Sequence, residues 1–227
     1  MKPLLLINPN TNFNTTTDMT MIARRASLPG QSLEGVTVKR GAPLIHDEEM
    51  LSLGATAVLE LVHAIDVTQY SGLIIAAFGD PGLDELRQTI SAPVTGIAEA
   101  GILEAARGER RFSIVTTTPR LVSAINIRVE RYGCQRTFAG IRLTDGDVND
   151  VMSDPVRLER ALAEACDRAI VEDGAEAIVI GGGPLAVHAE ALQKCFSVNI
   201  IEPVPAAVRL ANTRAYSGAS LDLQTSS

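Results

Sequence analysis

One sequence pattern occurs twice in the chain, as SGLIIAAFGDPGLDEL at Ser71–Leu86 and as AEAIVIGGGPLAVHAEAL at Ala175–Leu192. Each copy consists of a short apolar run, a loop rich in glycine, and a helical pattern. In a parallel α/β sheet such a loop lies at the carboxyl end of a strand, where ligands bind. Glycine lets backbone N–H groups approach a ligand, and the following helix directs its positive end toward the same place. Two copies predict two similar half-molecules that face each other across one cleft.

The rest of the chain fits a duplicated plan, because apolar stretches alternate with helical patterns and the order restarts at Phe112. This alternation is typical of parallel α/β units. We expect an α/β fold with two similar parallel-sheet domains related by a pseudo-twofold and an active-site cleft between them. The first domain is expected to comprise residues 1–97 with 205–227, and the second residues 98–204. The expected strands are 3–7, 36–40, 73–77, 93–96, 112–115, 138–143, 178–180 and 198–201. The acidic stretch Asp145–Asp150 is expected to be a loop, and Val204–Tyr216 the last helix.

Composition restricts the class of partner. The net charge is −7, and basic residues cluster only in pairs such as Arg24-Arg25, which argues against nucleic acid and anionic membranes. No apolar run approaches the ~20 residues of a membrane span. Cys134, Cys166 and Cys195 show no metal or redox spacing. We therefore expect a reduced, cytoplasmic setting and no cysteine-bound metal.

Four loops are expected at the carboxyl ends of strands: Asn8–Asn12, Ala77–Gly82, Thr116–Thr118 and Gly181–Gly183. They offer hydroxyl, amide and backbone N–H groups without lysine or arginine. Such groups suit a small carboxylate or an amide-bearing ring better than a polyphosphate. The alternative is that Asn and Thr only cap helices, which is their commonest role next to a helix.

A dinucleotide site is a competing interpretation. Gly181–Ala186 fits the pattern G-x-G-x-x-A after a strand, and Glu202 follows at a suitable distance. The motif lies near the end of the chain, however, and no second half-sheet follows it to complete a cofactor crevice. This position disfavours dinucleotide binding.

Three titratable side chains are candidates for proton transfer at the predicted cleft: Asp80, His46 and His188. Asp80 lies in the first repeated loop, and the two histidines lie near the same end of the predicted sheets. A carboxylate at a helix N-terminus is more often a cap than a base. Glu99 and Glu202 are open to the same alternative.

Four segments, INPNT at Ile7–Thr11, FGDPGL at Phe78–Leu83, GIAEA at Gly96–Ala100 and SIVTT at Ser113–Thr117, resemble the Asp/Glu/hydantoin racemase superfamily. The similarity is greatest to its hydantoin and allantoin racemase branch and runs from Pro3 to about Leu210. It implies two α/β domains, a cofactor-free active site between them, and self-association. It also implies a mechanism in which one cysteine thiolate removes the α-proton of the substrate and a second thiol delivers a proton to the opposite face.

The chain departs from this pattern at both cysteine positions, which resemblance assigns to Ala77 and Gly182. Neither residue can exchange a proton, so the two-thiol mechanism cannot run there. Three interpretations stay open: a racemase with another acid–base pair, a hydrolase or decarboxylase using the same cleft, and a ligand-binding protein without turnover. We expect first a racemase-like isomerase acting on a small amino-acid-derived carboxylate or a cyclic amide such as a hydantoin.

The residues expected to contact the small-molecule substrate fall into three groups. Hydrogen bonds are expected from Asn10, Thr11, Thr117 and Thr118, an oxyanion site from the backbone around Ala77, Phe78, Gly182 and Gly183, and apolar walls from Pro43 and Ile45.

Overall fold

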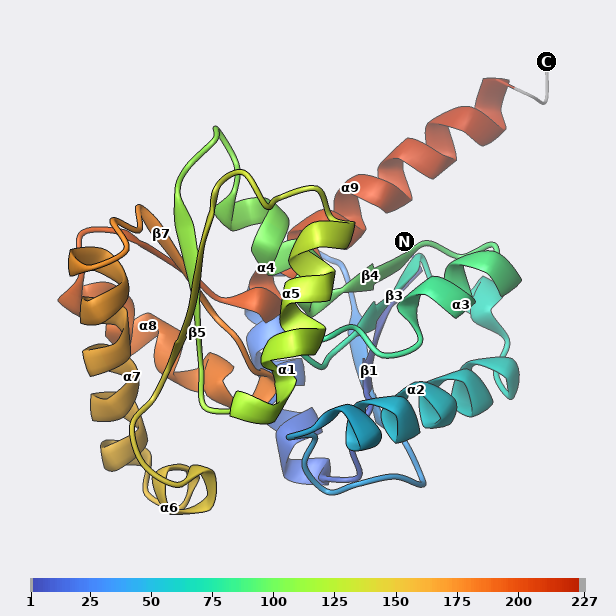
Figure 1. The fold of residues 1–227 in the computed structure, drawn as a ribbon. Coiled ribbons are helices and arrows are strands. Elements are labelled where there is room, and N and C mark those ends of the chain that lie inside the picture. The colour runs from blue at the N-terminus through green and yellow to red at the C-terminus, as the bar shows by residue number, and fades with distance from the viewer. Residues whose placement is uncertain (1, 225–227) are drawn as a thin grey trace.

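The computed structural model describes residues 2–224 and contains two parallel four-stranded sheets that lie side by side (Figure 1). The first sheet has the order β2-β1-β3-β4 and consists of β1 (Leu4–Asn8), β2 (Leu33–Thr37), β3 (Gly72–Ile75) and β4 (Val94–Gly96). The second has the order β6-β5-β7-β8 and consists of β5 (Phe112–Thr116), β6 (Phe138–Leu143), β7 (Ala177–Ile180) and β8 (Asn199–Ile201). The two sheets repeat one strand order, so the expected duplicated α/β fold is confirmed.

The helices lie between and around these strands. They are α1 (Phe13–Arg25), α2 (Glu48–His63), α3 (Leu83–Thr89), α4 (Ile97–Ala105), α5 (Val122–Arg131), α6 (Val148–Met152), α7 (Pro155–Val171), α8 (Ala189–Cys195) and α9 (Pro203–Gln224). Short 3₁₀ turns η1, η2 and η3 occupy Val67–Gln69, Pro119–Leu121 and Gly183–His188. Side-chain caps explain where several helices begin: the side chains of Asn12, Asp47 and Asp154 accept hydrogen bonds from the first backbone N–H groups of α1, α2 and α7.

Three elements differ from the sequence expectation. The strand expected at Val36–Arg40 begins earlier as β2, because buried Leu33 is the residue that pairs with Leu4. The acidic stretch expected as a loop contains α6, which Asp147 caps by accepting hydrogen bonds from Asn149 N and Asp150 N. The last helix, expected to end at Tyr216, continues to Gln224 as α9. The proposed domain boundaries stay a prediction, and their residues 1 and 225–227 lie outside the described part of the chain.

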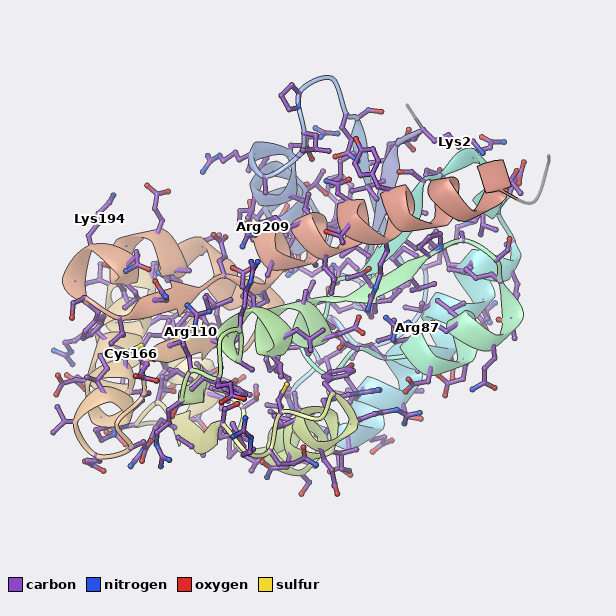
Figure 2. The ribbon with its side chains drawn as sticks, turned by 90° about the horizontal axis from the view of Figure 1, so that it is seen from above. Lys2, Arg87, Arg110, Cys166, Lys194 and Arg209 are labelled. Carbon is purple, nitrogen blue, oxygen red and sulfur yellow. The ribbon has the colours of Figure 1, made fainter. Side chains whose placement is uncertain are left out.

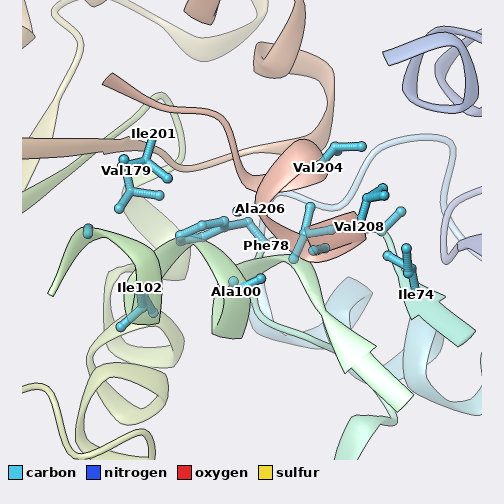
Figure 3. Close-up of a cluster of buried hydrophobic side chains, with 14 of the residues drawn as sticks. Ile74, Phe78, Ala100, Ile102, Val179, Ile201, Val204, Ala206 and Val208 are labelled. Atoms are coloured by element: carbon cyan, nitrogen blue, oxygen red, sulfur yellow. The ribbon is translucent and has the colours of Figure 1, made fainter. Parts of the chain in front are cut away.

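One buried hydrophobic cluster joins the two halves. It includes Ile74 of β3, Val179 of β7, Ile102 of α4, and Val204 and Val208 of α9 (Figure 3). Each such side chain is at most a few per cent exposed, and burial stabilises the fold by about 1.5–3 kcal/mol per large aliphatic residue. Because both sheets share this core, the loops at their carboxyl ends are held in fixed positions relative to one another.

Helix α9 crosses the first half (Figure 2). Two ion pairs connect α9 to helix α4. Arg209 of α9 makes two hydrogen bonds to the Glu104 carboxylate at 3.0 and 2.6 Å. Arg214 and Arg87 both contact the buried carboxylate of Glu99, at 2.7 and 2.6 Å. Burial alone would raise the pKa of Glu99, but the hydrogen bonds from the two arginines outweigh it and hold the pKa below its usual range. Among the described residues, no helix is both long and apolar enough to span a membrane.

Candidate functional site

A small cavity of about 50 Å³ lies between the two halves, at the carboxyl ends of the strands. The loops after β1, β3, β5 and β7 contribute Asn10, Ala76, Ala77, Phe78, Thr117, Thr118, Gly181, Gly182, Gly183, Pro184 and Leu185. Leu44, Ile45, Leu121, Ile125 and Met152 complete the lining. Residues from both sheets therefore form one concave site, where a parallel α/β fold is expected to bind its ligand.

Most residues predicted to contact a ligand line this cavity. They are Asn10, Ile45, Ala77, Phe78, Thr117, Thr118, Gly182 and Gly183. In the part of the chain that the structure describes, Thr11 and Pro43 do not line it. The N–H of Thr11 donates to the carbonyl oxygen of Ala42 at 3.0 Å, and Pro43 faces solvent. Both residues instead belong to the outer part of the loops near the cavity.

Several residues that line the cavity could not be predicted from the composition of the loops. Leu121 and Ile125 come from η2 and α5, and Met152 comes from α6, which begins within the acidic stretch expected as a loop. Leu121 and Ile125 are spaced as residues on one apolar face of a helix. This spacing is the sequence signal from which they could be predicted to face the interior. Together with Leu44 and Ile45 they give the cavity a wall of apolar side chains.

Glycines let the two halves approach closely at the cavity. A Cβ atom at Gly181 would lie 2.9 Å from Ile114 and 3.3 Å from the ring of Phe78. A Cβ at Gly183 would lie 2.8 Å from the sulfur of Met19 and 3.2 Å from the carbonyl oxygen of Ala76. These contacts leave no space for larger residues. The second repeated loop is therefore glycine-rich because it packs against the first half.

Asn10 presents a hydrogen-bond donor to the cavity. Its side-chain oxygen accepts from Asn8 Nδ2 and from the backbone N–H of Asn12, both at 2.9 Å. The backbone donor fixes the orientation of the Asn10 amide, because an N–H requires an oxygen opposite it. Within the described residues the Nδ2 group of Asn10 has no acceptor. It is free to donate to a ligand carbonyl.

The threonines of the second half present complementary groups. Thr116 donates its hydroxyl proton to the carbonyl oxygen of Gly181 at 2.7 Å, so Thr118 must be the donor in its 3.1 Å contact with Thr116. This leaves lone pairs of Thr118 Oγ1 as acceptors. The hydroxyl of Thr117 contacts only the sulfur of Met152, at 3.8 Å, in the described part of the structure. The cavity thus combines a donor, an acceptor and a hydroxyl able to act as either.

Asp80 is fully buried and does not line the cavity. Its carboxylate accepts hydrogen bonds from the backbone N–H groups of Ala98 and Glu99, at 2.9 and 2.7 Å, and from the Tyr132 hydroxyl at 2.6 Å. Burial raises the pKa of Asp80 to about 6, against the opposing effect of these hydrogen bonds and of Arg128. At neutral pH the ionised carboxylate therefore caps the N-terminus of α4.

The two candidate histidines also lie outside the cavity lining. His46 follows the lining residue Ile45, is partly exposed, and its Nδ1 lies 3.6 Å from the carboxylate of Asp47. His188 is buried at the end of η3, with Nδ1 3.5 Å from the carboxylate of Glu159 on α7. Of the two imidazoles, His46 is the one adjacent in sequence to the cavity and accessible to solvent.

The positions assigned by resemblance to the family cysteines, Ala77 and Gly182, both line the cavity. Leu185 occupies the space beside Gly182, where an added Cβ would lie 3.0 Å from its side chain. The cysteines of the chain lie elsewhere, and burial raises the pKa of the Cys166 thiol to about 12. Among the described residues, no group of three His, Cys, Asp or Glu side chains is arranged to hold a metal ion.

The fold and the cleft define a class of two-unit α/β proteins with a ligand site between two parallel sheets. Residues 4–211 match the family described as Asp/Glu/Hydantoin racemase, and the chain belongs to this family.

Individual relatives agree with this assignment. The chain is 35% identical to a hydantoin racemase from Rhizobium meliloti, over 91% of this chain and 86% of that protein. It is 33% identical to a hydantoin racemase from Pseudomonas sp. (strain NS671), over 92% of this chain and 84% of that protein. The structure of allantoin racemase from Klebsiella pneumoniae superposes with a TM-score of 0.89 at 33% identity, covering 96% and 89% of the two chains.

Proposed function

We propose that this protein is a cofactor-independent, racemase-like isomerase that acts on a small cyclic amide of the hydantoin type without using cysteine thiols. Family membership supports an isomerase-like function. The observation that carries the choice of ligand is the hydrogen-bond polarity of the cavity. A hydantoin ring alternates carbonyl acceptors with N–H donors, which complement Asn10 Nδ2 and Thr118 Oγ1.

A free amino-acid carboxylate fits this cavity less well. A carboxylate offers only acceptors, so it would oppose the lone pairs of Thr118. Among the described residues, no lysine or arginine lines the cavity to balance that charge. An uncharged ring therefore loses less solvation free energy on entering this site than an anion does.

Charge that develops on a ring carbonyl after loss of the α-proton needs donors. The N–H of Phe78 has no acceptor in the described part of the chain, whereas the N–H of Gly182 donates to the carbonyl oxygen of Ile180 at 3.1 Å. We assign oxyanion stabilisation to Phe78 N–H together with Asn10 Nδ2. We assign removal of the α-proton to His46, the accessible imidazole next to Ile45, and return of a proton to the opposite face of the ring to a water molecule from solvent.

The cavity holds only a few water molecules at its present volume, so a ring can enter only if side chains of the apolar wall move. Met152 is unbranched and lies on the short helix α6, which makes it the side chain best suited to turn away. A hydantoin with a branched apolar substituent at C5 would then contact Leu121, Ile125 and Ile45.

Ligand binding without turnover is the second candidate. It is favoured by one observation: in the part of the chain that the structure describes, no residue with an ionisable side chain lines the cavity. The predicted cytoplasmic location and homo-oligomer stay predictions, and the oligomer can be tested by sedimentation velocity.

The test is α-proton exchange in deuterated water, followed by NMR, with 5-isopropylhydantoin as substrate and valine as the matched amino acid. We expect exchange of the hydantoin α-proton above the buffer rate, and no exchange with valine. His46→Gln should reduce the exchange at least tenfold, whereas His63→Gln, on the exposed surface of α2, should leave it unchanged. Binding of the hydantoin with no exchange would refute the isomerase proposal and establish the second candidate.

A further inference from the structure

The loop that follows β3 has an unusual backbone. Gly79, Asp80 and Gly82 all have positive φ values, of 128°, 50° and 79°. Asp80 is not a glycine, so the left-handed conformation is sterically unfavourable for it and persists only when surrounding contacts impose it. This loop directly follows Ala77 and Phe78, which line the cavity. The contacts that fix the conformation of this loop therefore also fix the positions of Ala77 and Phe78 in the cavity lining.

The inner side of the loop is held by the Asp80 carboxylate at the start of α4. A Cβ atom at Gly96 would lie 2.1 Å from the Asp80 side chain, so the carboxylate is seated directly against the backbone there. Two of its hydrogen bonds come from α4 itself, and the third comes from the hydroxyl of Tyr132. Tyr132 follows α5 and belongs to the second half of the chain.

The outer side of the loop is held by Arg128 of α5. Its Nε donates to the carbonyl oxygen of Gly79 at 2.8 Å, and its Nη2 donates to the carbonyl oxygen of Asp80 at 3.2 Å. Its Nη1 forms an ion pair with Asp84 at 2.7 Å. One guanidinium thus binds the loop backbone and the start of α3 together. A lysine has a single nitrogen and cannot reproduce this geometry.

The same helix face also reaches the cavity. Ile125, Arg128 and Tyr132 are spaced by three and four residues, so they lie on one side of α5 and its end. Ile125 lines the cavity, while Arg128 and Tyr132 hold the loop that carries Ala77 and Phe78. Helix α5 lies between the two sheets in Figure 1. Helix α5 and its end therefore supply both a residue of the cavity wall and the side chains that hold the loop.

We propose that Arg128 and Tyr132 are positioning residues, which hold the Gly79–Gly82 loop against α5 and thereby keep Phe78 N–H directed at the ligand. This proposal rests on the proposed function for the identity of the ligand, but not for the effect on the loop. Neither residue contacts the ligand. Replacing either side chain would lower the affinity for the ligand indirectly, because the loop would no longer be held in place.

The test uses the full chain with Arg128→Lys and Tyr132→Phe. The matched controls are Arg160→Lys on the exposed surface of α7 and Tyr70→Phe, which removes only the hydroxyl that donates to the carboxylate of Glu34. Hydrogen exchange of the backbone amides in residues 77–82, measured without ligand by mass spectrometry, should become at least tenfold faster in both variants. Exchange in α7 should not change. Thermal unfolding measured in parallel shows that the variants remain folded.

Titration calorimetry with 5-isopropylhydantoin supplies the second readout. Both variants should bind it at least fivefold more weakly than the wild type, and the controls should bind it equally well. Unchanged loop exchange in two folded variants would overturn the proposal. If the wild type does not bind the hydantoin, the proposed function fails, yet the loop exchange still decides the role of Arg128 and Tyr132.

Discussion

The two halves share one topology but hold their cavity loops by different forces. After β3, the loop carrying Asp80 is fixed by a buried carboxylate, a tyrosine hydroxyl and the guanidinium of Arg128. After β7, the loop at Gly181–Gly183 is fixed by a hydrogen bond from Thr116 and by tight packing against Phe78 and Met19. One wall of the cavity thus depends on paired charges and the other on close packing of glycines.

The two halves also differ in the carboxylates at the N-termini of the helices that follow β4 and β8. In the first half, Glu99 is paired with Arg87 and Arg214, and its pKa lies below the usual range. In the second half, burial first and then the neighbouring charge of Glu190 raise the pKa of Glu202 to about 7. Two carboxylates in comparable places therefore respond to pH in opposite directions. The comparison teaches that a duplicated fold does not impose duplicated electrostatics.

The strongest test of the contrast is Asp80→Ala. The substitution leaves two backbone N–H groups and the Tyr132 hydroxyl without their acceptor in a buried place, so we expect a loss of about 3–5 kcal/mol in the free energy of unfolding. Urea denaturation followed by circular dichroism measures it. Asp167→Ala on the exposed side of α7 is the control and should change stability by less than ~0.5 kcal/mol. Equal stability of both variants would show that the loop after β3 does not depend on its charges.

The next largest effect is expected for Glu99→Gln. At neutral pH the substitution should cost about 2 kcal/mol, because two arginines lose their charged partner. The folded-state pKa of Glu99 is lowered, so its contribution is present above the unfolded value of 4.5 and is lost as the pH falls below it. Urea denaturation at pH 7 and pH 4 should therefore show a difference from wild type that shrinks in acid. A difference that grows in acid would contradict the assignment.

The smallest effect, of opposite sign, is expected for Glu202→Gln. The folded-state pKa of Glu202 is raised, so the wild type is stabilised below the unfolded value of 4.5 and loses that contribution as the pH rises through about 7. The variant should be more stable than wild type by about 1–2 kcal/mol at pH 8 and should match it near pH 4. Denaturation curves at the two pH values measure this. A variant that is destabilised at pH 8 would show that Glu202 has an ionic partner in the folded protein.

Much of this architecture follows from local sequence. The repeated run–loop–helix pattern predicts parallel strands with ligand loops at their carboxyl ends, because buried strands and glycine turns have strong local signals. Asn10, Thr117 and Thr118 could be selected for the same reason. The start of β2 does not follow from local sequence, because the alternation at Val36 and Val38 does not reveal that Leu33 pairs with Leu4.

The tertiary contacts of the site could not be predicted in this way. The burial of Asp80 depends on Gly96 and on Tyr132, which lie far from it in the sequence. Met152 reaches the cavity only because Asp147 starts a short helix within an acidic stretch. Sequence patterns locate groups along the chain, but which group faces the ligand is decided by packing between distant segments.

The central claim is that the cavity recognises a neutral cyclic amide through the donor of Asn10 and the acceptor of Thr118. The direct measurement is titration calorimetry with 5-isopropylhydantoin for the wild type and for Asn10→Asp. The aspartate keeps the oxygen that accepts from Asn8 and Asn12 but replaces the free donor with an acceptor. The account predicts binding to the wild type and at least tenfold weaker binding to the folded variant. Equal affinity of the two proteins would contradict it.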